Sequence, residues 1–411
     1  KGKLEPRHIV MRVFAIWDGQ AYTVMPGGLT RVSTSAQSLV VSMQMGGGSK
    51  DTWVLRGGAE EDASHVLPVH EEYSLNRTDL PSRVADNLYW LGRYSERVES
   101  SVRLVRSLLP SLSGEEDFGH TATLDTAVQL LHALGYLEEE FESLSIAQMR
   151  WHLERLLSSM VYDPTRSSGI GWNLNSIRRV AWPLKERLSQ DTWRVLQQLE
   201  AEFSAPVPVY RENRLVAQMN LLDRVIVTLS AFAGLLTENT TRGHGWQFVQ
   251  IGKRLERALQ MTELLAATFG DPPFDLDPVM QTLLQIADSS ITYRSRYFTT
   301  VRPEYVLDLL LKDPTNPRSL LFQLAGIADH MKKLPGYAGT SPGPAPARLA
   351  EAVLSRIQEA NVADLTVRDR DGNMPPLDDL LRQLKGELYD ISDALTELHF
   401  SHVSSARFRT V

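Results

Sequence analysis

Two stretches of the sequence, Gly92-Arg93-Tyr94-Ser95-Glu96-Arg97 and Gly252-Lys253-Arg254-Leu255-Glu256-Arg257, carry the same Gly-x-x-x-Glu-Arg pattern and decide the fold. Apolar residues recur around both stretches in the same register, at the three- and four-residue spacing of one helix face. Residues four apart share a helix face, so each glycine lies one turn from its glutamate. The common register predicts two long helices that arose by internal duplication.

The chain after Leu80 has a helical pattern throughout. Asp163-Pro164-Thr165 recurs as Asp313-Pro314-Thr315, and each copy precedes a polar turn and a helical stretch, so the duplication extends beyond the two opening stretches. The predicted fold class is mainly α, an internally duplicated all-helical bundle domain preceded by a small β segment. Helices are expected at about 83–109, 121–136, 145–160, 173–188, 191–203, 211–237, 244–268, 276–291, 303–311, 318–333, 346–359 and 376–402.

The first part of the chain has the pattern of β structure. Ile9 to Trp17 is predicted to be a strand, and the Asp-Gly pair that follows it is predicted to turn the chain into a second strand at Ala21–Met25. Two more strands are expected at Ser38–Met43 and Thr52–Leu55. A hairpin and two short strands are too small to fold alone, so their edges need partners that this part of the sequence does not supply.

Three domains or segments follow from these patterns. Residues 1–56 form the β segment, residues 57–79 are polar and acidic and are predicted to be a linker, and residues 80–405 form the helical domain.

Composition restricts the class of protein. The formal net charge is −7 and no dense basic stripe occurs, which argues against a nucleic-acid partner. The sequence contains no cysteine, which excludes disulfides and thiolate chemistry. By this reading no apolar run approaches the length of a membrane span, and the start of the sequence lacks the pattern of a signal peptide. We therefore expect a cytoplasmic protein with no membrane partner.

Glu96 and Glu256 are the candidate catalytic residues. If the two long helices pack against each other, these carboxylates converge, with four arginines beside them as candidate substrate-binding residues: Arg93, Arg97, Arg254 and Arg257. One interpretation is a Glu–Arg network that only fixes the register of the helices. The other is a site that binds a ligand or catalyses a reaction. No Glu-x-x-His pair accompanies the glutamates, so no metal site is predicted.

Three other arginines are further candidates for substrate binding. Arg242 precedes the second long helix, Arg294 lies in a cluster of arginine and tyrosine, and Arg318 follows an Asn-Pro pair. Each of these clusters is also consistent with a purely structural role.

A glycine run at residues 46–48 is followed by Ser49 and Lys50. It lacks the Gly-Lys-Ser/Thr order of a phosphate-binding loop. It either presents backbone N–H groups and a cation to an anion or is a flexible connection between strands.

Residues 80–97, read as Leu-Pro-Ser-Arg-Val-Ala-Asp-Asn-Leu-Tyr-Trp-Leu-Gly-Arg-Tyr-Ser-Glu-Arg, resemble the opening of the Alpha-E domain, an all-helical bacterial domain. The second Gly-x-x-x-Glu-Arg stretch and Asp313-Pro314-Thr315-Asn316-Pro317-Arg318 resemble its later motifs, and the resemblance covers about 80–403. Residues 7–55 are similar to the C-terminal end of a circularly permuted ATP-grasp protein. There Arg31 and Lys50 are the candidate cofactor-binding residues.

The resemblance implies a longer parent in which an ATP-grasp ligase is joined to an Alpha-E domain. Such ligases activate a carboxylate as an acyl phosphate and pass it to an amine, so ATP and Mg²⁺ are implied for the complete ligase and a peptide-bond-forming reaction is expected. The acidic metal ligands and nucleotide-binding strands have no counterpart in residues 1–70, so no cofactor is expected for this chain alone.

The expected partners are the missing ATP-grasp core, in cis or in trans, and an amino acid or peptide substrate, with a homodimer as a further possibility. Three roles for the helical domain remain open. It binds the acceptor or product, it is a non-catalytic scaffold or dimerisation module for the ligase, or it is a hydrolase that uses a glutamate as general base.

Overall fold

The computed structural model describes residues 6–17, 20–33, 35, 41, 48–54, 80–112, 118–137, 145–167, 169–203, 211–270, 276–298, 300–337 and 343–400. The chain divides into two compact units. The first comprises Lys1–Asp79 with Lys185–Asp191, and the second comprises Leu80–Leu184 with Thr192–Val411.

The N-terminal unit contains a three-stranded antiparallel sheet in the order β1-β2-β3. Its strands are β1 (Ile9–Trp17), β2 (Tyr22–Val32) and β3 (Gly48–Trp53). The predicted pairing of the first two strands is confirmed, with Ile9 opposite Val32 and Trp17 opposite Tyr22. The second strand is longer than predicted because it continues through Gly27 and Gly28, where a Cβ atom would press against a carbonyl oxygen of the neighbouring strand.

Two of the β predictions have a different outcome. The third strand begins at Gly48 and ends at Trp53, earlier at both ends than the predicted Thr52–Leu55. The strand predicted at Ser38–Met43 falls almost entirely outside the described residues, as do the Asp-Gly turn and the linker predicted at 57–79.

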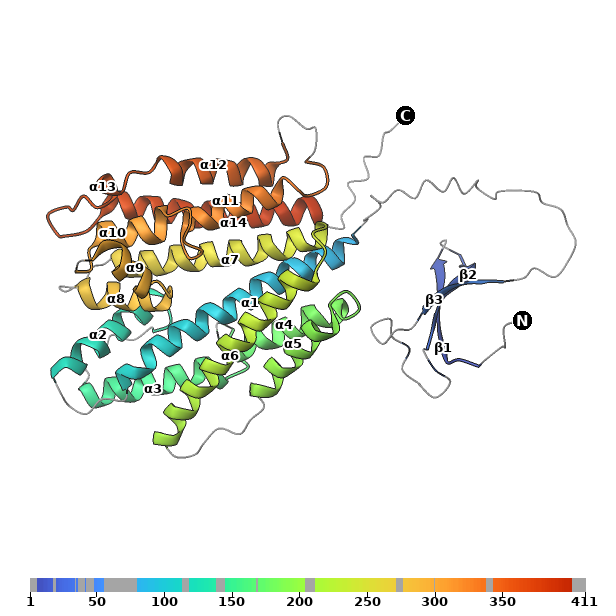
Figure 1. Cartoon of the computed structure of the whole chain (residues 1–411), viewed down its shortest axis with the longest axis horizontal. Helices are drawn as coiled ribbons and strands as arrows, with labels where there is room; N and C mark the ends of the chain where they lie inside the picture. The colour runs from blue at the N-terminus through green and yellow to red at the C-terminus, as the bar shows by residue number, and fades with distance from the viewer. Residues whose placement is uncertain are drawn as a thin grey trace, which may run out of the picture. The chain divides into compact units, whose positions relative to one another are not determined.

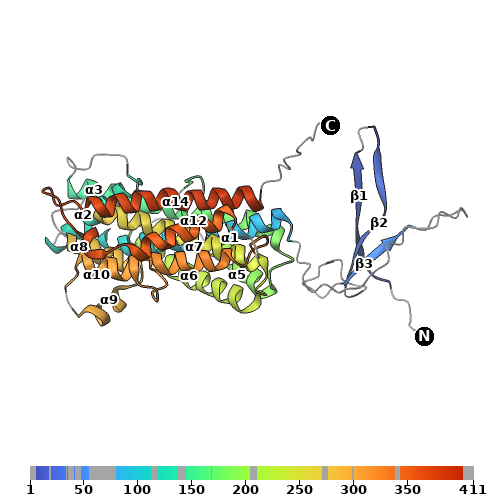
Figure 2. The same cartoon turned by 90° about the horizontal axis from the view of Figure 1, so that it is seen from above.

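The second unit is a bundle of helices built around α1 (Ser82–Leu108) and α7 (His244–Phe269), which lie side by side through its middle (Figures 1 and 2). Next to α1 are α4 (Ile170–Ala181) and α6 (Arg211–Asn239), and next to α7 are α11 (Leu320–Met331) and α14 (Pro375–His399). The remaining helices are α2 (Phe118–Ala133), α3 (Ile146–Tyr162), α5 (Gln190–Phe203), α8 (Leu276–Ile286), α9 (Ser290–Tyr297), α10 (Pro303–Leu307), α12 (Ala345–Glu359) and α13 (Val362–Leu365). The protein is thus mainly helical, as predicted.

Two glycines allow the central helices to approach closely. A Cβ atom on Gly92 would collide with the carbonyl oxygen of Val249, and one on Gly252 would collide with the carbonyl oxygen of Tyr89. Val249 and Tyr89 each lie three residues before the glycine of their own helix, so the two contacts are equivalent. The apolar seam on both sides is fully buried, and side chains such as Val98 are not exposed at all. Backbone-to-backbone packing at this crossing therefore fixes where the following glutamates lie.

The Asp-Pro-Thr copies adopt the same turn. Oδ1 of Asp163 accepts hydrogen bonds from the amide and hydroxyl of Thr165 at 2.8 and 2.6 Å. Oδ1 of Asp313 accepts the same two bonds from Thr315 at 2.8 and 2.7 Å. Each turn leads into a helix that packs on one of the central helices, α4 on α1 and α11 on α7.

Three of the predicted helices differ from the structure by more than small shifts at their ends. The helix predicted at 173–188 ends at Ala181, because Pro183 follows in a 3₁₀ turn. The stretch predicted at 276–291 is two helices, separated where Asp288 adopts a left-handed conformation with φ 52°. The helix predicted at 303–311 is α-helical only to Leu307 and continues as a π-helical turn at Asp308–Lys312.

One helix is more apolar than expected. Arg214–Asn239, in α6, is the described helix that is long and apolar enough to cross a membrane by length and composition. Its buried residues, including Leu222 and Val225, recur at the spacing of one helix face, and α6 packs on α1. A core helix of a helical bundle has the same properties, so this is weak evidence for a membrane span.

Candidate functional site

The glutamates of the two Gly-x-x-x-Glu-Arg stretches lie at the crossing of α1 and α7, and each is bound by the arginine of the other stretch. Arg257 donates from Nε and Nη2 to the two carboxylate oxygens of Glu96, with Nη2 2.8 Å from Oε2. Arg97 binds Glu256 in the same way, with distances of 2.6 and 3.0 Å. Both glutamates are 1% exposed. We call these four residues the crossed pairs.

The position after each glycine adds a further cation. Nε of Arg93 lies 2.7 Å from Oε2 of Glu256, and Nη1 of Arg93 donates to the hydroxyls of Tyr89 and Ser392 at 3.2 and 3.1 Å. The equivalent residue on α7 is Lys253. Burial lowers the pKa of its ammonium group, and the nearby Glu96 opposes that shift. The two sides of the crossing are thus similar in charge but not identical.

On the Glu96 side the network continues to Glu99. Nη2 of Arg318 and Nε of Arg103 lie 2.7 and 3.0 Å from Oε1 of Glu99, and Nη2 of Arg257 lies 3.6 Å from Oε2. The spacing of α1 places Glu99 and Arg103 one and two turns beyond Glu96 on nearly the same face, which is a signal that the sequence contains. Glu99 was nevertheless not predicted as a site residue, because its partner Arg318 comes from the turn before α11.

The neighbouring arginines lower the pKa values of two of these carboxylates, Glu256 and Glu99. Burial alone would raise the pKa of Glu256, but Arg93 and Arg97 together lower it below its usual range. Burial would also raise the pKa of Glu99, but the charges of Arg318 and Arg257 outweigh burial and hold this pKa well below the ordinary value. A general base at neutral pH needs a raised pKa and an oxygen that is free to accept a proton. Glu256 has a lowered pKa, and both its oxygens accept hydrogen bonds from arginine.

The other predicted site residues lie elsewhere. Arg254 packs over the ring of Phe322 at 5.2 Å and donates to Gln323 at 3.3 Å, on the side of α7 that faces α11. Arg242 stacks on Trp246 at 4.0 Å ahead of α7, and Arg294 is exposed on α9. In the N-terminal unit, Arg31 is on β2 and Lys50 is on β3. The structure therefore brings together Arg93, Arg97, Arg257, Arg318 and both glutamates, and leaves the rest apart.

Two cavities border the crossed pairs. One of about 260 Å³ is lined by Arg93, Arg97 and Glu256 together with Tyr136, Asn173 and Tyr389. A much smaller one of about 70 Å³ lies beside Glu96, Glu99 and Lys253, against α6. Within the described ranges, no three histidine, aspartate or glutamate side chains are grouped to hold a metal ion.

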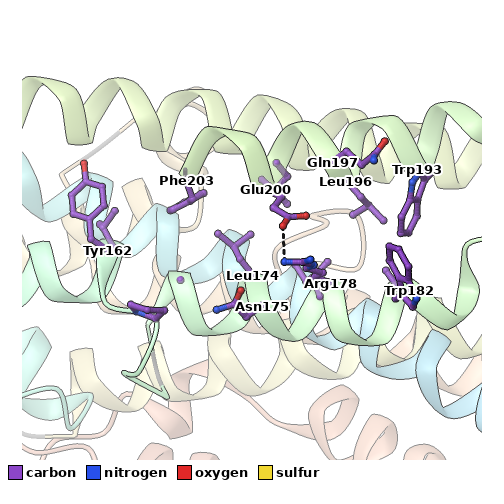
Figure 3. Close-up of a pocket in the computed structure, with 16 residues that line it drawn as sticks. Tyr162, Leu174, Asn175, Arg178, Trp182, Trp193, Leu196, Gln197, Glu200 and Phe203 are labelled. Carbon is purple, nitrogen blue, oxygen red and sulfur yellow. Dashed lines mark ion pairs between the residues drawn. The ribbon is translucent and has the colours of Figure 1, made fainter. Parts of the chain in front are cut away.

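A larger cavity of about 530 Å³ lies between α4 and α5, away from the crossed pairs (Figure 3). Trp182 and Trp193 stand at one end of it, and an ion pair between Arg178 and Glu200 crosses its middle. None of its lining residues was predicted from the sequence. Tryptophans in helical stretches are typical of a core, and nothing in the sequence indicates that Trp182 would be 62% exposed.

Comparisons with known proteins give a family but no activity. The model of the Alpha-E family, described as a predicted α-helical domain with a conserved ER motif, matches residues 80–400. The Glu-Arg dipeptides of the crossed pairs fit that description. No solved structure matches the chain.

The curated relatives are uncharacterized proteins. The chain is 27% identical over 413 residues to Rv2567 of Mycobacterium tuberculosis and to Mb2597 of Mycobacterium bovis, covering 96% of this chain and 46% of each relative. Over a shorter stretch of 66 residues, the chain is 54% identical to Rv2411c of Mycobacterium tuberculosis. This stretch covers 16% of this chain and 12% of the relative. The chain thus spans about half the length of the relatives that it matches over most of its own length.

Proposed function

The chain belongs to the Alpha-E family, and from this premise we propose that it is the C-terminal part of an ATP-dependent carboxylate–amine ligase. In this proposal the β segment completes an ATP-grasp core that is supplied in cis or in trans. The helical unit is a rigid scaffold that holds the acceptor amine or the product near that core.

The observation that carries the proposal is the exposed apolar sheet of the N-terminal unit. All nine residues of β1 are exposed, and these include Ile16 at 72% and Trp17 at 54%. Adjacent residues of a strand point to opposite faces, so apolar side chains are exposed on both faces of the sheet. A sheet of three strands with two apolar faces needs further structure on each side to be stable in water. The missing core of a larger α+β domain is the partner that we propose.

The length of the relatives supports the same view. Because the chain accounts for 46% of Rv2567, more than half of that protein lies outside the matched region and leaves room for a catalytic core. In this proposal Mg²⁺ and ATP bind to that core.

The contacts of the crossed pairs favour a structural role for Glu96 and Glu256 over a role in hydrolysis. Each carboxylate is buried, accepts two hydrogen bonds from an arginine and faces the opposite helix. A buried ion pair adds little net stability, but removing one partner is costly, so we propose that these pairs hold the two helices in one register. We therefore propose that the crossed pairs lock α1 against α7, and that the hydrolase alternative is the less favoured one.

The proposal includes the internal duplication. The crossed pairs and the two glycine contacts repeat on both central helices in corresponding positions. The two Asp-Pro-Thr turns precede α4 and α11, the helices that pack on α1 and on α7. A duplicated unit explains why a Glu-Arg dipeptide is needed twice: each copy supplies the carboxylate that the other copy's arginine binds.

Reconstitution tests the ligase. The chain is mixed with the remaining N-terminal part of the longer parent, Mg²⁺ and ATP, and a panel of amino acids is added while ADP release is followed. We expect ADP release that requires both parts, and hydroxylamine should trap the acyl phosphate as a hydroxamate. Continued inactivity across a broad panel, or equal activity without this chain, would count against the proposal.

A substitution of one glutamate distinguishes a scaffold role of the helical unit from a catalytic role. Glu96→Gln keeps the shape of the side chain and removes its charge. If the crossed pairs are structural, the variant loses stability, while the ligase activity of the folded fraction stays within about twofold. Loss of turnover with unchanged stability would instead make Glu96 a general base.

A further inference from the structure

We propose that the cavity between α4 and α5 binds a free α-amino acid with an aromatic or large apolar side chain. The cavity has about 530 Å³, within the range of roughly 300–1,000 Å³ that small-molecule sites occupy. Calling the amino acid the acceptor amine rests on the proposed ligase function. The binding itself does not.

The apolar part of the cavity fits the side chain. Its base is formed by buried side chains, including Ile177 at 3% and Leu199 at 2% exposure. At one end the rings of Trp182 and Trp193 meet at 60° with their centroids 5.9 Å apart (Figure 3). Two indoles set at an angle present both a face and an edge, and aromatic rings pack favourably in offset-stacked and edge-to-face arrangements.

The polar part of the cavity fits the charged groups of an amino acid. Nη1 of Arg178 lies 2.8 Å from Oε1 of Glu200, and the two side chains are 61% and 50% exposed. An ion pair this exposed contributes little to folding, so a ligand can separate it at little cost. A free α-amino acid carries its carboxylate and its ammonium group on one carbon atom. It can therefore replace one protein ion pair with two, placing the carboxylate on Arg178 and the ammonium on Glu200.

The arrangement also selects against related molecules. A compound with only a carboxylate leaves Glu200 next to an apolar or neutral group, and a compound with only an amine leaves Arg178 in the same position. A small amino acid such as alanine fills the polar part but leaves the indoles and the apolar base in water. We expect recognition to require both charges and the large side chain.

Titration of the intact chain with four small molecules tests this inference. L-Phenylalanine is compared with N-acetyl-L-phenylalanine, L-phenylalanine amide and L-alanine, by calorimetry and by tryptophan fluorescence. We expect L-phenylalanine to bind with a Kd of about 1 mM or tighter, and each of the other three to bind at least about tenfold more weakly.

Variants locate the binding in the cavity. Arg178→Gln and Glu200→Gln should each weaken the binding of L-phenylalanine at least about tenfold. Trp193→Leu should weaken binding and reduce the fluorescence change to the part that Trp182 reports. Glu351→Gln is the matched control, because Glu351 pairs with Lys332 on another part of the surface with nearly the same exposures, 50% and 60%. Its Kd should equal that of the parent chain. Circular dichroism checks that each variant is folded.

Three results would overturn the inference. They are the absence of saturable binding of L-phenylalanine, equal binding of the acetylated and amidated compounds, and binding that the cavity variants leave unchanged. No ATP or partner is present in this experiment, so its outcome is independent of the ligase reconstitution. Binding of L-phenylalanine without ligase activity would support the proposed amino-acid site and contradict the proposed ligase function. Ligase activity without binding would support the ligase function and contradict the amino-acid site.

Discussion

Arg257 binds both carboxylate oxygens of Glu96, a residue 161 positions away in the sequence. The reverse contact, Arg97 on Glu256, spans 159 positions. Because the partners of each pair come from different central helices, neither helix can neutralise its own buried charge. The stability of the crossing therefore depends on both pairs together, and on Arg93, which also binds Glu256.

The first prediction concerns the charge of Glu256. Glu256→Gln leaves Arg93 and Arg97 beside a neutral amide, and the Arg93 side chain is only 4% exposed. We expect the free energy of unfolding to fall by about 3–5 kcal/mol, the range for breaking a buried pair from one side. Urea unfolding measures it. In the control Asp379→Asn, which breaks a surface pair with Arg382 with both side chains 75% exposed, we expect a change within about 0.5 kcal/mol. Equal losses in the two variants would contradict the role of the crossed pairs.

The second prediction concerns the close approach of the central helices. Gly92→Ala places a methyl group against the backbone of Val249, so α1 and α7 must separate. We expect a loss of at least about 2 kcal/mol, by analogy with overpacked cores. Gly386→Ala in α14 is the control, since a Cβ atom there has nothing within 4 Å. It should stabilise the chain by about 0.4–1 kcal/mol. A destabilised Gly386→Ala, or a neutral Gly92→Ala, would show that the helix spacing is not set by the glycines.

The third prediction concerns the stability of the protein near neutral pH. Burial and the nearby Arg254 lower the pKa of His330 to about 4, and its Nδ1 lies 2.7 Å from Oε1 of Gln247. In the unfolded chain His330 therefore binds a proton as the pH falls through about 6.5, whereas in the folded chain it stays neutral until the pH approaches 4. Stability is fully present above about pH 6.5 and falls as the pH drops from there towards 4.

The variant His330→Asn keeps a hydrogen-bond donor but cannot be protonated in this range. Urea unfolding at pH 7, 6 and 5 should show a smaller loss of stability for the variant than for the parent chain. A residual slope is expected because burial also lowers the pKa of His399. If the variant and the parent lose the same stability, His330 is not the group responsible.

The fourth prediction concerns acid unfolding. The pKa values of Glu256 and Glu99 are lowered in the folded chain, where arginine charges outweigh the effect of burial. Their contribution to stability is present above the pKa of an unfolded glutamate, about 4.3, and is lost as the pH falls through the folded values. We expect a steep loss below about pH 4.5, and the loss should be smaller in Glu256→Gln. A parent chain as stable at pH 3 as at pH 5 would contradict this.

The fifth prediction concerns the independence of the helical unit. A truncated chain of residues 80–411 should keep the helical circular dichroism and the thermal midpoint of the unit, because the family model matches residues 80–400 on its own. The full chain should bind the hydrophobic dye ANS more strongly, because it also carries the exposed apolar strands. Unfolding of the truncated chain would show that the first seventy-nine residues are needed for the bundle.

The sequence predicts the central part of the fold because the register is repeated. The glycine and glutamate of each stretch lie one turn apart, so two such helices in contact must bring Glu96 and Glu256 close to arginines. What the register cannot give is which arginine binds which carboxylate. That depends on the crossing point, which Gly92 and Gly252 set through contacts with the opposite backbone. A pairing within one helix and a pairing across two helices look the same in a single sequence.

The cavity between α4 and α5 was missed for a different reason. Trp182 and Trp193 lie on either side of Pro183, and their rings meet only because the 3₁₀ turn at Trp182–Leu184 redirects the chain. A sequence pattern records that these residues are apolar and does not record their exposure. Arg318 was predicted as a site residue, but its contact with Glu99 was not, since that contact spans 219 positions and depends on the packing of α11 against α7.

The crossed pairs also restrict how this chain can change. If Glu256 were lost, Arg97 would be left unneutralised on the other helix, so a tolerated substitution in one motif requires a matching substitution in the other. A fragment that carries only one motif should be insoluble or bind tightly to its counterpart. The two halves of the bundle must therefore be inherited together, because each half supplies the arginine that the buried glutamate of the other half requires.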